Sequence, residues 1–454
     1  MKIRIININD IEGFKIGNAE NIDKGTGCTV VICEDGAVGG VDVRGGGPAT
    51  RETDLLKSEN TIDAINAVVL SGGSAFGLEA ASGVMRELSD RGLGYDTGYG
   101  RVPIVCGASL FDLSVGDSSV FPDVEMGREA VRNAYEGKFE HGNRGAGTGA
   151  SVGKFKGMNR AMKSGLGTFA CGDNYLQVGA VVAVNAMGDI YNGAGNIVAG
   201  LRTEEGDQIF GSIKSLKTMV HNYNDSDNSD TQSTDANEIG RDTRSYNKSE
   251  IADAIRNAFS NRVKDAAITD ESKGAALDAS SSDIDVSDNI DNITDFYTSD
   301  MMVTGHISKS EIEEAQNMTQ DAPTDYISDE VPVKQEPVAE TIAEPEPIFD
   351  DDDMGYDISF NTTIACLVTN AKMTKSQANK LASILHDAYA RSIKPVHGTM
   401  DGDTIFVLTN NKAEVNFDAF AALSTDVLQY AIIDAGSSAK SAYGLPAACD
   451  IIKK

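Results

Sequence analysis

The stretch ISFNTTIACLVTN, from Ile358 to Asn370, follows a long acidic tract and marks the return of strand-like sequence. Its residues are mostly small, β-branched or apolar, which is typical of a buried β-strand. The strand starts abruptly at Asn361-Thr362-Thr363 and has no partner strand in the acidic sequence before it. We therefore expect it to pair with strands from the first 215 residues of the chain.

The sequence after this strand predicts a β-α-β-α unit. Thr374 starts a capping box with Gln377, which favours a helix. The stretch HGTMDGDTIFVLTN (397–410) predicts a turn and a second strand, and the apolar spacing of Phe417–Ala435 predicts a second helix. Both strands of this unit need partners from elsewhere in the chain.

The first 215 residues are glycine-rich and alternate strand-like with helix-like stretches. The expected elements are a helix over Ala75–Leu88 and strands over Cys28–Cys33, Asn66–Leu70 and Gln177–Asn185. After the last strand, Gly188-Asp189 has the composition of a hairpin turn into Ile190-Tyr191 and predicts antiparallel pairing.

The 454-residue chain carries a formal net charge of −30, and one segment holds most of it. Residues 221–353 contain 33 acidic and 9 basic side chains, a charge of 9 − 33 = −24, so the rest carries −30 + 24 = −6. We interpret 216–357 as an acidic, mostly disordered insert with one amphipathic helix over 249–263. It separates a core of residues 1–215 from a segment, 358–454, that completes the same domain. No basic stripe is present, which argues against a nucleic-acid partner.

Nothing in the residue pattern calls for a metal, a cofactor or a membrane. The six cysteines lack C-x-x-C spacing and have no histidine beside them in a metal pattern, so we expect reduced core thiols. The N-terminal residues lack the apolar region of a signal peptide, and no apolar run approaches the roughly 18–20 residues of a membrane helix. These features predict a soluble, cytoplasmic protein.

The glycine-rich stretch GAGTGASVGKF (145–155) is similar to a phosphate-binding loop but does not match the pattern. Thr148 and Phe155 stand where that loop needs Gly and Ser or Thr. What remains is Lys154, which is either a surface lysine or an amine held on a flexible glycine-rich turn.

Three further polar residues have both a structural and a chemical interpretation. Asp401 and Asp403 form either a plain turn or a pair of carboxylates that orient an amine and tune its pKa. Asn185 ends an apolar strand, where it caps the strand or donates to an oxyanion. The histidines show no Ser/His/Asp arrangement, and we expect His386 and His397 to be structural.

Thr362 lacks a nearby histidine to act as its base. N-terminal nucleophile enzymes use the α-amine of the nucleophile itself, whose unperturbed pKa is about 7.7–8.0. An internal threonine acquires that amine only when the chain is cut before it. The residues alone leave two interpretations open, an ordinary strand start and a cleavage site between Asn361 and Thr362.

Long stretches of the chain resemble the self-cleaving L-aminopeptidase/D-esterase family, which includes DmpA-like enzymes, β-aminopeptidases and nylon-oligomer hydrolases. The resemblance covers residues 1 to about 215 and 358–454, in order, and leaves out the acidic insert. The stretches that carry it are TGCTVVICEDGAVGGVDVRGGGPATRETDLL (26–56), VVLSGGSAFGLEAASGV (68–84), GAGTGASVGK, VGAVVAVNAMGD and NTTIACLVTN with HGTMDGDT.

The resemblance implies a four-layer α/β/β/α sandwich, related to that of ornithine acetyltransferase. It implies cleavage between Asn361 and Thr362, with the Thr362 hydroxyl as nucleophile and its α-amine as base. By similarity to the threonine-type members, Lys154 and Asn185 assist attack and stabilise the oxyanion, and Asp401 and Asp403 orient the amine. The chain departs from the pattern at Phe111, an implied substrate-binding position, where some members carry a tyrosine hydroxyl.

The implied activity is hydrolysis of short peptides, amides or esters with a free amino end, through an acyl-enzyme on threonine. The two fragments form an αβ unit, and we expect a homo-oligomer of such units. Two alternatives are open: an acyltransferase similar to ornithine acetyltransferase, and a processed scaffold without catalysis.

Overall fold

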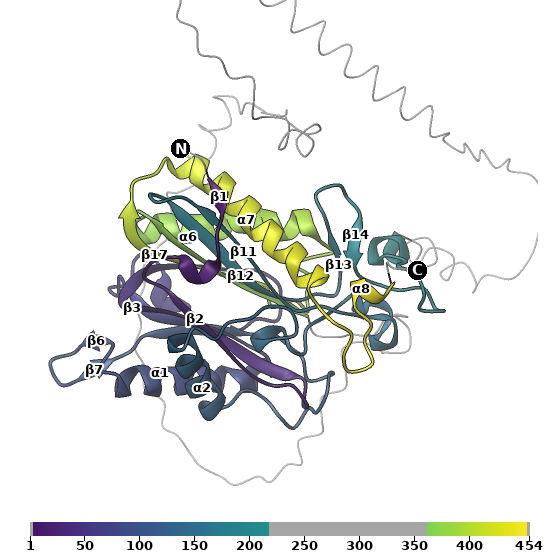
Figure 1. The fold of residues 1–454 in the computed structure, drawn as a ribbon, viewed down its shortest axis with the longest axis horizontal. Helices are drawn as coiled ribbons and strands as arrows, with labels where there is room; N and C mark the ends of the chain where they lie inside the picture. The colour runs from purple at the N-terminus through teal and green to yellow at the C-terminus, as the bar shows by residue number, and fades with distance from the viewer. Residues whose placement is uncertain (1–2, 218–360, 452–454) are drawn as a thin grey trace, which may run out of the picture. The chain divides into compact units, whose positions relative to one another are not determined.

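The computed structural model describes residues 3–217 and 361–451, in which two mixed sheets share one long strand and lie between helices (Figure 1). The strands of the first sheet, in spatial order, are β1 (Arg4–Ile5), β11 (Leu166–Gly172), β12 (Gln177–Asn185), β15 (Thr362–Ala371), β17 (Thr404–Ala413) and β3 (Thr26–Val43). The second sheet continues from β3 to β5 (Ile65–Ser71), β8 (Val105–Ser109) and β4 (Ala49–Arg51), and β2 (Lys15–Asn21) also pairs with β3.

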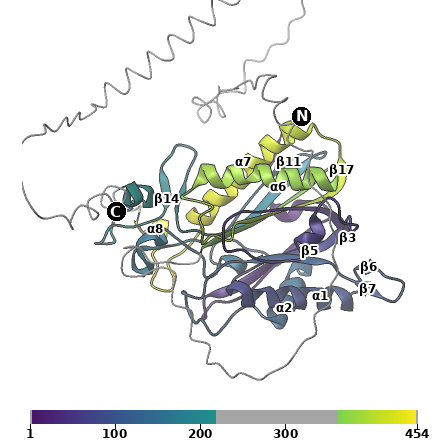
Figure 2. The same cartoon turned by 180° about the vertical axis from the view of Figure 1, so that it is seen from behind.

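The α-helices lie on the outer faces of the two sheets, as the opposite views of Figures 1 and 2 show. The covering helices are α1 (Ala80–Asp90), α2 (Val124–Tyr135), α6 (Lys375–Ser392) and α7 (Phe417–Ser437), and the chain also has the short α8 (Ala448–Ile451) and a helical stretch at 212–217. Small strands lie outside the two sheets: β6 (Tyr95–Asp96), β7 (Arg101–Val102), β9 (Ser151–Val152), β10 (Met162–Lys163), β13 (Asp189–Tyr191), β14 (Ile197–Ala199) and β16 (Ile393–Lys394). The 3₁₀ helices are η1 (Ile8–Asp10), η2 (Asp54–Leu56), η3 (Ser74–Glu79), η4 (Gly145–Gly147), η5 (Lys154–Lys156) and η6 (Met158–Arg160).

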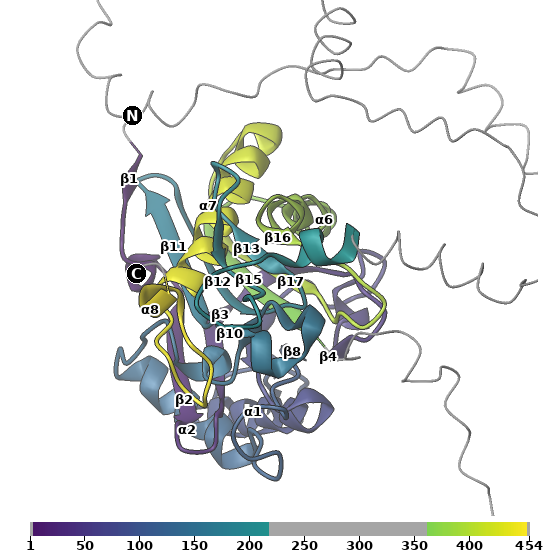
Figure 3. The same cartoon turned by 90° about the vertical axis from the view of Figure 1, so that its right-hand side faces the viewer.

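Strand β15 lies in the middle of the first sheet and joins the two parts of the chain (Figure 3). It pairs antiparallel with β12, where Thr362 lies opposite Asn185, and parallel with β17. Strand β17 in turn pairs antiparallel with β3. The prediction that the C-terminal strands pair with strands of the first 215 residues is therefore confirmed.

Three apolar cores separate the layers. Along β15, Ile364, Cys366 and Val368 belong to the core between the two sheets, whereas Ala365 and Leu367 belong to the core under α6 and α7. A third core lies between the second sheet and helices α1 and α2. Successive side chains of a strand point to opposite faces, so a strand that is apolar throughout fits a sheet buried on both sides. The layers run helices, sheet, sheet, helices, which confirms the predicted α/β/β/α sandwich.

Several predicted elements have the expected bounds or nearly so. β12 spans Gln177–Asn185, α7 spans Phe417–Ser437, and the capping box of Thr374 and Gln377 is present at the start of α6. The predicted start of the β15 segment at 358–360 and the predicted helix over 249–263 lie outside the described residues.

Three local predictions differ from the structure. The strand predicted over Cys28–Cys33 is much longer, because β3 runs through both sheets. The predicted helix over Ala75–Leu88 begins as the 3₁₀ helix η3, after the left-handed Gly73 (φ 79°), and becomes α-helical only at Ala80. Ile190-Tyr191 does pair antiparallel, but its partners are β14 and β16 instead of β12.

The six cysteines are free thiols, and five of them are buried. Within the described ranges, no helix combines the length and the apolar character that crossing a bilayer would require.

The contact between α6 and β3 depends on Gly40. A Cβ atom at this position would lie 2.2 Å from the backbone carbon of Ala378 and 2.4 Å from the nitrogen of Asn379. We predict that Gly40→Ala lowers the midpoint of thermal unfolding, because overpacking costs about 1–3 kcal/mol. Gly100→Ala is the matched control, since nothing lies within 4 Å of its Cβ position. Equal midpoints for the two variants would contradict this packing.

Candidate active site

Thr362 is the first residue of β15, and only 4% of its surface is exposed. Its hydroxyl donates a hydrogen bond of 2.5 Å to the carbonyl oxygen of the preceding residue, Asn361. That oxygen also accepts a hydrogen bond of 2.9 Å from the backbone N–H of Gly402. The hydroxyl therefore lies against the peptide bond at which the family resemblance implies cleavage.

Asn185 faces Thr362 across the sheet and is fully buried. Its side-chain oxygen accepts hydrogen bonds from Lys154 Nζ (2.9 Å) and from the backbone N–H of Ser151 (3.1 Å). Its side-chain nitrogen donates to the backbone oxygen of Phe111 at 2.7 Å. The register of the sheet thus places Asn185 opposite Thr362, and Asn185 in turn contacts Lys154 and the backbone of Phe111.

Lys154 is buried, so the interpretation as a surface lysine is wrong. The left-handed Gly153 (φ 70°) turns the chain inward, and the backbone N–H of Lys154 donates to Met187 at 3.0 Å. Its amine donates to the backbone oxygen of Asn185 (3.2 Å) as well as to the side chain. Burial lowers the pKa of Lys154 to about 7, although the negative charges of Asp401 and Asp112 oppose this shift.

Asp401 and Asp403 come from the turn before β17 and are both buried. Asp403 accepts from the backbone N–H of Thr363 at 2.8 Å, and Asp401 accepts from the N–H of Gly398 at 2.6 Å. Burial, followed by the charge of Asp403, raises the pKa of Asp401 to about 6. The turn therefore places two carboxyl groups beside the first residues of β15.

Backbone hydrogen bonds hold this turn against the loop after β3. The N–H of Gly47 donates to the carbonyl of Asp401 at 2.9 Å, and the N–H of Arg44 donates to the carbonyl of Asp403 at 2.7 Å. The stretch RGGGP, which helped to carry the family resemblance, is thus part of the support of the site.

His397 has a role that the sequence did not reveal. Its Nδ1 lies 2.8 Å from Asp403 Oδ2, and its backbone N–H donates to the same oxygen at 3.2 Å. Its backbone is left-handed (φ 58°), which turns the ring back toward Asp403. In the sequence, the feature that could have indicated this contact is that His397 lies six residues before Asp403. His386, by contrast, contacts the backbone of Asp42 through Nε2 at 3.2 Å, in keeping with a structural role.

A second buried lysine, Lys163, supports the loop that leads to Lys154, and the sequence gave no sign of it. Its amine donates to the backbone oxygens of Gly147 (3.0 Å), Ala150 (2.9 Å) and Ser164 (2.5 Å). Burial lowers its pKa to about 7, although the charge of Asp112 opposes the shift. The amine of Lys163 therefore holds the glycine-rich stretch 145–153 in place within the fold.

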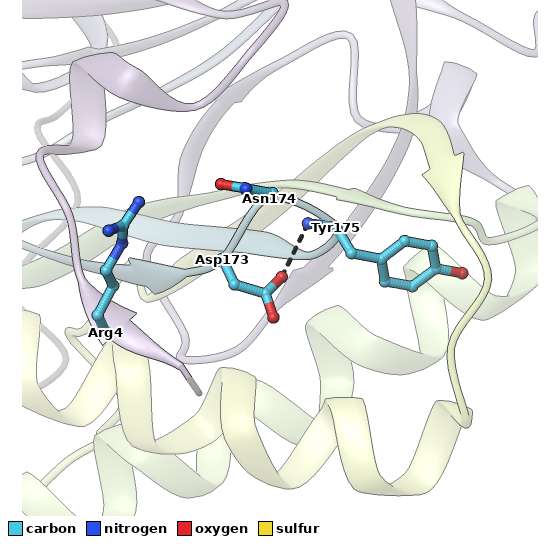
Figure 4. Close-up of a pocket in the computed structure, with 4 residues that line it drawn as sticks. All are labelled: Arg4, Asp173, Asn174 and Tyr175. Carbon is cyan, nitrogen blue, oxygen red and sulfur yellow. Dashed lines mark hydrogen bonds between the residues drawn. The ribbon is translucent and has the colours of Figure 1, made fainter. Parts of the chain in front are cut away.

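A surface hollow lined by Arg4, Asp173, Asn174 and Tyr175 lies elsewhere (Figure 4). It adjoins the Gln177 end of β12, whereas Thr362 pairs with Asn185 at the opposite end of that strand. The hollow is therefore separate from the candidate site. Within residues 3–217 and 361–451, no three His, Cys, Asp or Glu side chains gather as metal ligands.

The fold is that of the Ntn hydrolases, because two solved structures match it over most of their length. One is an L-aminopeptidase/D-Ala-esterase/amidase of Ochrobactrum anthropi, a variant of the Ntn hydrolase fold (TM-score 0.50, 14% identity, 95% of this chain and 86% of that chain). The other is a protein of Pyrococcus horikoshii OT3 (TM-score 0.50, 15% identity, 97% and 89%).

Sequence comparison identifies the family. The model of peptidase family S58 matches residues 7–226 and 289–446, and the chain belongs to this family. An uncharacterized aminopeptidase of Mycobacterium leprae is 42% identical over 203 residues, which are 41% of this chain and 54% of the relative. A 6-aminohexanoate-oligomer endohydrolase of Kocuria sp. is 35% identical over 191 residues, 42% of this chain and 51% of the relative. The chain thus spans about half the length of the curated relatives it matches.

Because burial lowers the pKa of Lys163, we expect the free energy of unfolding to depend measurably on pH. Its pKa is about 7 when folded and 10.5 in its ordinary state, so the unfolded chain binds more protons between these values. Stability should therefore rise with pH above 7, by at most about 1.4 kcal/mol per unit for this one group. We predict that Lys163→Met reduces the slope of unfolding free energy between pH 7 and 8.5.

The measurement is urea unfolding at several pH values. Lys380→Met, at an exposed position of α6, is the control and should keep the slope of the parent protein. An unchanged slope in Lys163→Met would show that Lys163 is not held in its neutral form.

Proposed function

We propose that this member of peptidase family S58 cuts itself between Asn361 and Thr362 and then acts as an amide hydrolase. The observation that supports this proposal most directly is the position of the Thr362 hydroxyl, which lies 2.5 Å from the Asn361 carbonyl oxygen. The site is buried, and it includes Asn185 and the Lys154 amine bonded to it. The acyl shift is intramolecular, so its reacting groups are already held together in the fold.

In the proposed self-cleavage, the Thr362 oxygen attacks the Asn361 carbonyl carbon and loses its proton. The bond between that carbon and the Thr362 nitrogen then breaks, and the nitrogen takes up a proton. An ester now joins Asn361 to the Thr362 side chain. Water hydrolyses this ester, which leaves a carboxylate on Asn361 and a free α-amine and hydroxyl on Thr362.

Lys154 is the proposed proton acceptor of the first step, because the Thr362 nitrogen is still an amide and has no basic lone pair. A pKa near 7 leaves a substantial neutral fraction of Lys154 at neutral pH. Two N–H bonds of the neutral amine are accounted for by the hydrogen bonds to Asn185, and its lone pair is then left to accept a proton.

In the cut enzyme, the free α-amine of Thr362 would serve as the base for attack on a substrate. The acyl-enzyme on Thr362 would then be hydrolysed by water. Asp401 and Asp403 lie beside this amine and would orient it, and their charge favours substrates with an ammonium group. Asn185 is the proposed oxyanion donor, and Phe111 a proposed wall of the substrate site.

The proposed substrates are short peptides or amides with a free amino end. The name of the first relative, an aminopeptidase, fits a free amino end, and the name of the second, a 6-aminohexanoate-oligomer endohydrolase, fits a short amide substrate. The two fragments would remain together as an αβ unit, because β15 and β17 are inner strands of a sheet completed by the first fragment. Assembly of such units into a homo-oligomer is part of the same proposal.

Replacing the nucleophile should stop both reactions. We predict that Thr362→Val, which keeps the size of the side chain but lacks the hydroxyl, stays one chain and hydrolyses no aminoacyl-p-nitroanilide. Thr362→Ser and Thr363→Val should both release a C-terminal fragment of 454 − 361 = 93 residues. Intact mass and N-terminal sequencing provide the test, with Thr-Thr-Ile-Ala expected for the parent chain, Ser-Thr-Ile-Ala for Thr362→Ser and Thr-Val-Ile-Ala for Thr363→Val. A 93-residue fragment from Thr362→Val would refute the assignment.

The pH dependence of self-cleavage tests the role of Lys154. Because its pKa is lowered to about 7, it is mostly protonated below that pH and mostly neutral above it. Cleavage of newly refolded precursor should therefore speed up about tenfold per pH unit below 7 and level off above it. In Lys154→Arg the side chain stays charged, so cleavage should be slow throughout.

Lys156→Arg, on the same loop, is the matched control and should keep the profile of the parent protein. Appearance of the 93-residue fragment after dilution from urea, followed by gel electrophoresis, gives the rates. A parent-like profile in Lys154→Arg would exclude Lys154 as the base.

A further inference from the structure

The turn Asp401-Gly402-Asp403 contains a backbone donor aimed at the bond that the proposed reaction breaks. The N–H of Gly402 donates to the carbonyl oxygen of Asn361 at 2.9 Å. The same oxygen lies 2.5 Å from the Thr362 hydroxyl. This is the oxygen on which negative charge would develop when the hydroxyl attacks.

The position of this donor is fixed from several sides. Asn361 and Asp401 form an isolated parallel bridge, and the N–H of Asn361 donates to Met400 at 3.1 Å. The other end of the Asp401–Gly402 peptide group is also held, because the carbonyl of Asp401 accepts from Gly47 at 2.9 Å. A peptide group bonded at both ends is polarised and needs no reorientation during the reaction.

Burial makes such a donor necessary. Asn361 is completely buried and Thr362 is 4% exposed, so the oxyanion would form away from bulk water. Asn185 is engaged differently in the uncut chain, since its side-chain nitrogen donates to the backbone of Phe111. The N–H of Gly402 already donates to the reacting oxygen and, unlike the Thr362 hydroxyl, takes no part in the attack.

A side chain at position 402 would obstruct the nucleophile. A Cβ atom there would lie 2.8 Å from Thr362 Oγ1 and 2.9 Å from the carbonyl oxygen of Gly47. Glycine thus lets the turn approach the scissile bond closely and leaves room for the hydroxyl to move onto the carbonyl carbon.

We infer that the backbone N–H of Gly402 is the oxyanion donor of the self-cleavage, a role distinct from that proposed for Asn185 in substrate turnover. This inference rests on the proposed self-cleavage. As the bond from Thr362 Oγ1 to the Asn361 carbon forms, the carbonyl electron pair moves onto oxygen and the Gly402 hydrogen bond strengthens. When the carbon–nitrogen bond breaks, the pair returns and the ester is formed.

The sharpest test removes the N–H without adding atoms that clash. Glycolic acid in place of glycine at position 402, introduced by nonsense suppression in cell-free translation, replaces the amide N–H by an ester oxygen. Loss of one preorganised oxyanion donor should slow formation of the 93-residue fragment by about 10²–10³-fold. The control is the same replacement at Gly46, whose N–H supports the loop by donating to Gly398 at 3.2 Å.

Hydroxylamine identifies the step that is affected, because it cleaves an accumulated ester but not the original amide. If Gly402 acts on ester formation, hydroxylamine should release no additional fragment that begins at Thr362. The ester introduced into the backbone is itself cleaved by hydroxylamine, but that cut gives a different fragment, which begins at residue 402. Release by hydroxylamine of the fragment that begins at Thr362, or slowing no greater than in the Gly46 control, would overturn the inference. Absence of cleavage in the unaltered chain would instead refute the proposed function itself.

Discussion

The pairing of Thr362 with Asn185 across β15 and β12 is the constraint on which the candidate site depends. A slip of one residue would turn the Thr362 side chain to the other face of the sheet. The same slip would exchange the two cores that β15 serves, because Ile364 and Leu367 occupy opposite faces. Both faces are closely packed, so the cores fix the register, and the register then fixes the distance between the hydroxyl and its surroundings.

Burial shifts the pKa values of two ionisable side chains near Thr362 toward each other. Burial disfavours the charged form of any group, and it therefore lowers the pKa of Lys154 and raises that of Asp401 toward a common range near neutrality. Their mutual attraction opposes both shifts. Two groups with similar pKa values can exchange a proton at little cost in free energy, and pKa values near 7 suit acid–base chemistry at neutral pH. His397 contributes differently, since its two contacts fix the position of Asp403.

The local sequence was sufficient to predict those helices and strands whose ends are set by neighbouring residues. The turn residues around Gln177–Asn185 delimit β12, and the capping box at Thr374 starts α6. It did not reveal the length of β3, because that strand is extended by partners in two sheets. Of the candidate residues, Asn185 pairs with Thr362 and accepts from Lys154, and Asp401 and Asp403 lie in the turn that contacts Asn361 and Thr363. Their chemical roles stay predictions. The contacts of His397 and Lys163 were not predicted, because a side-chain contact with a carboxylate or with loop carbonyl groups leaves no periodic pattern in the sequence.

Burial of the Asn361–Thr362 bond has opposite effects on the two steps of the proposed self-cleavage. The acyl shift needs no water, and exclusion of water strengthens every hydrogen bond to the reacting groups. Hydrolysis of the ester does need water, which must reach a site where Asn361 is completely buried. A backbone hydrogen bond from Gly47 to Asp401 packs the loop after β3 against that site in the uncut chain. Water therefore has to reach the ester after the shift, while residue 361 is still tethered to the Thr362 side chain, and residue 361 leaves only when that ester is hydrolysed.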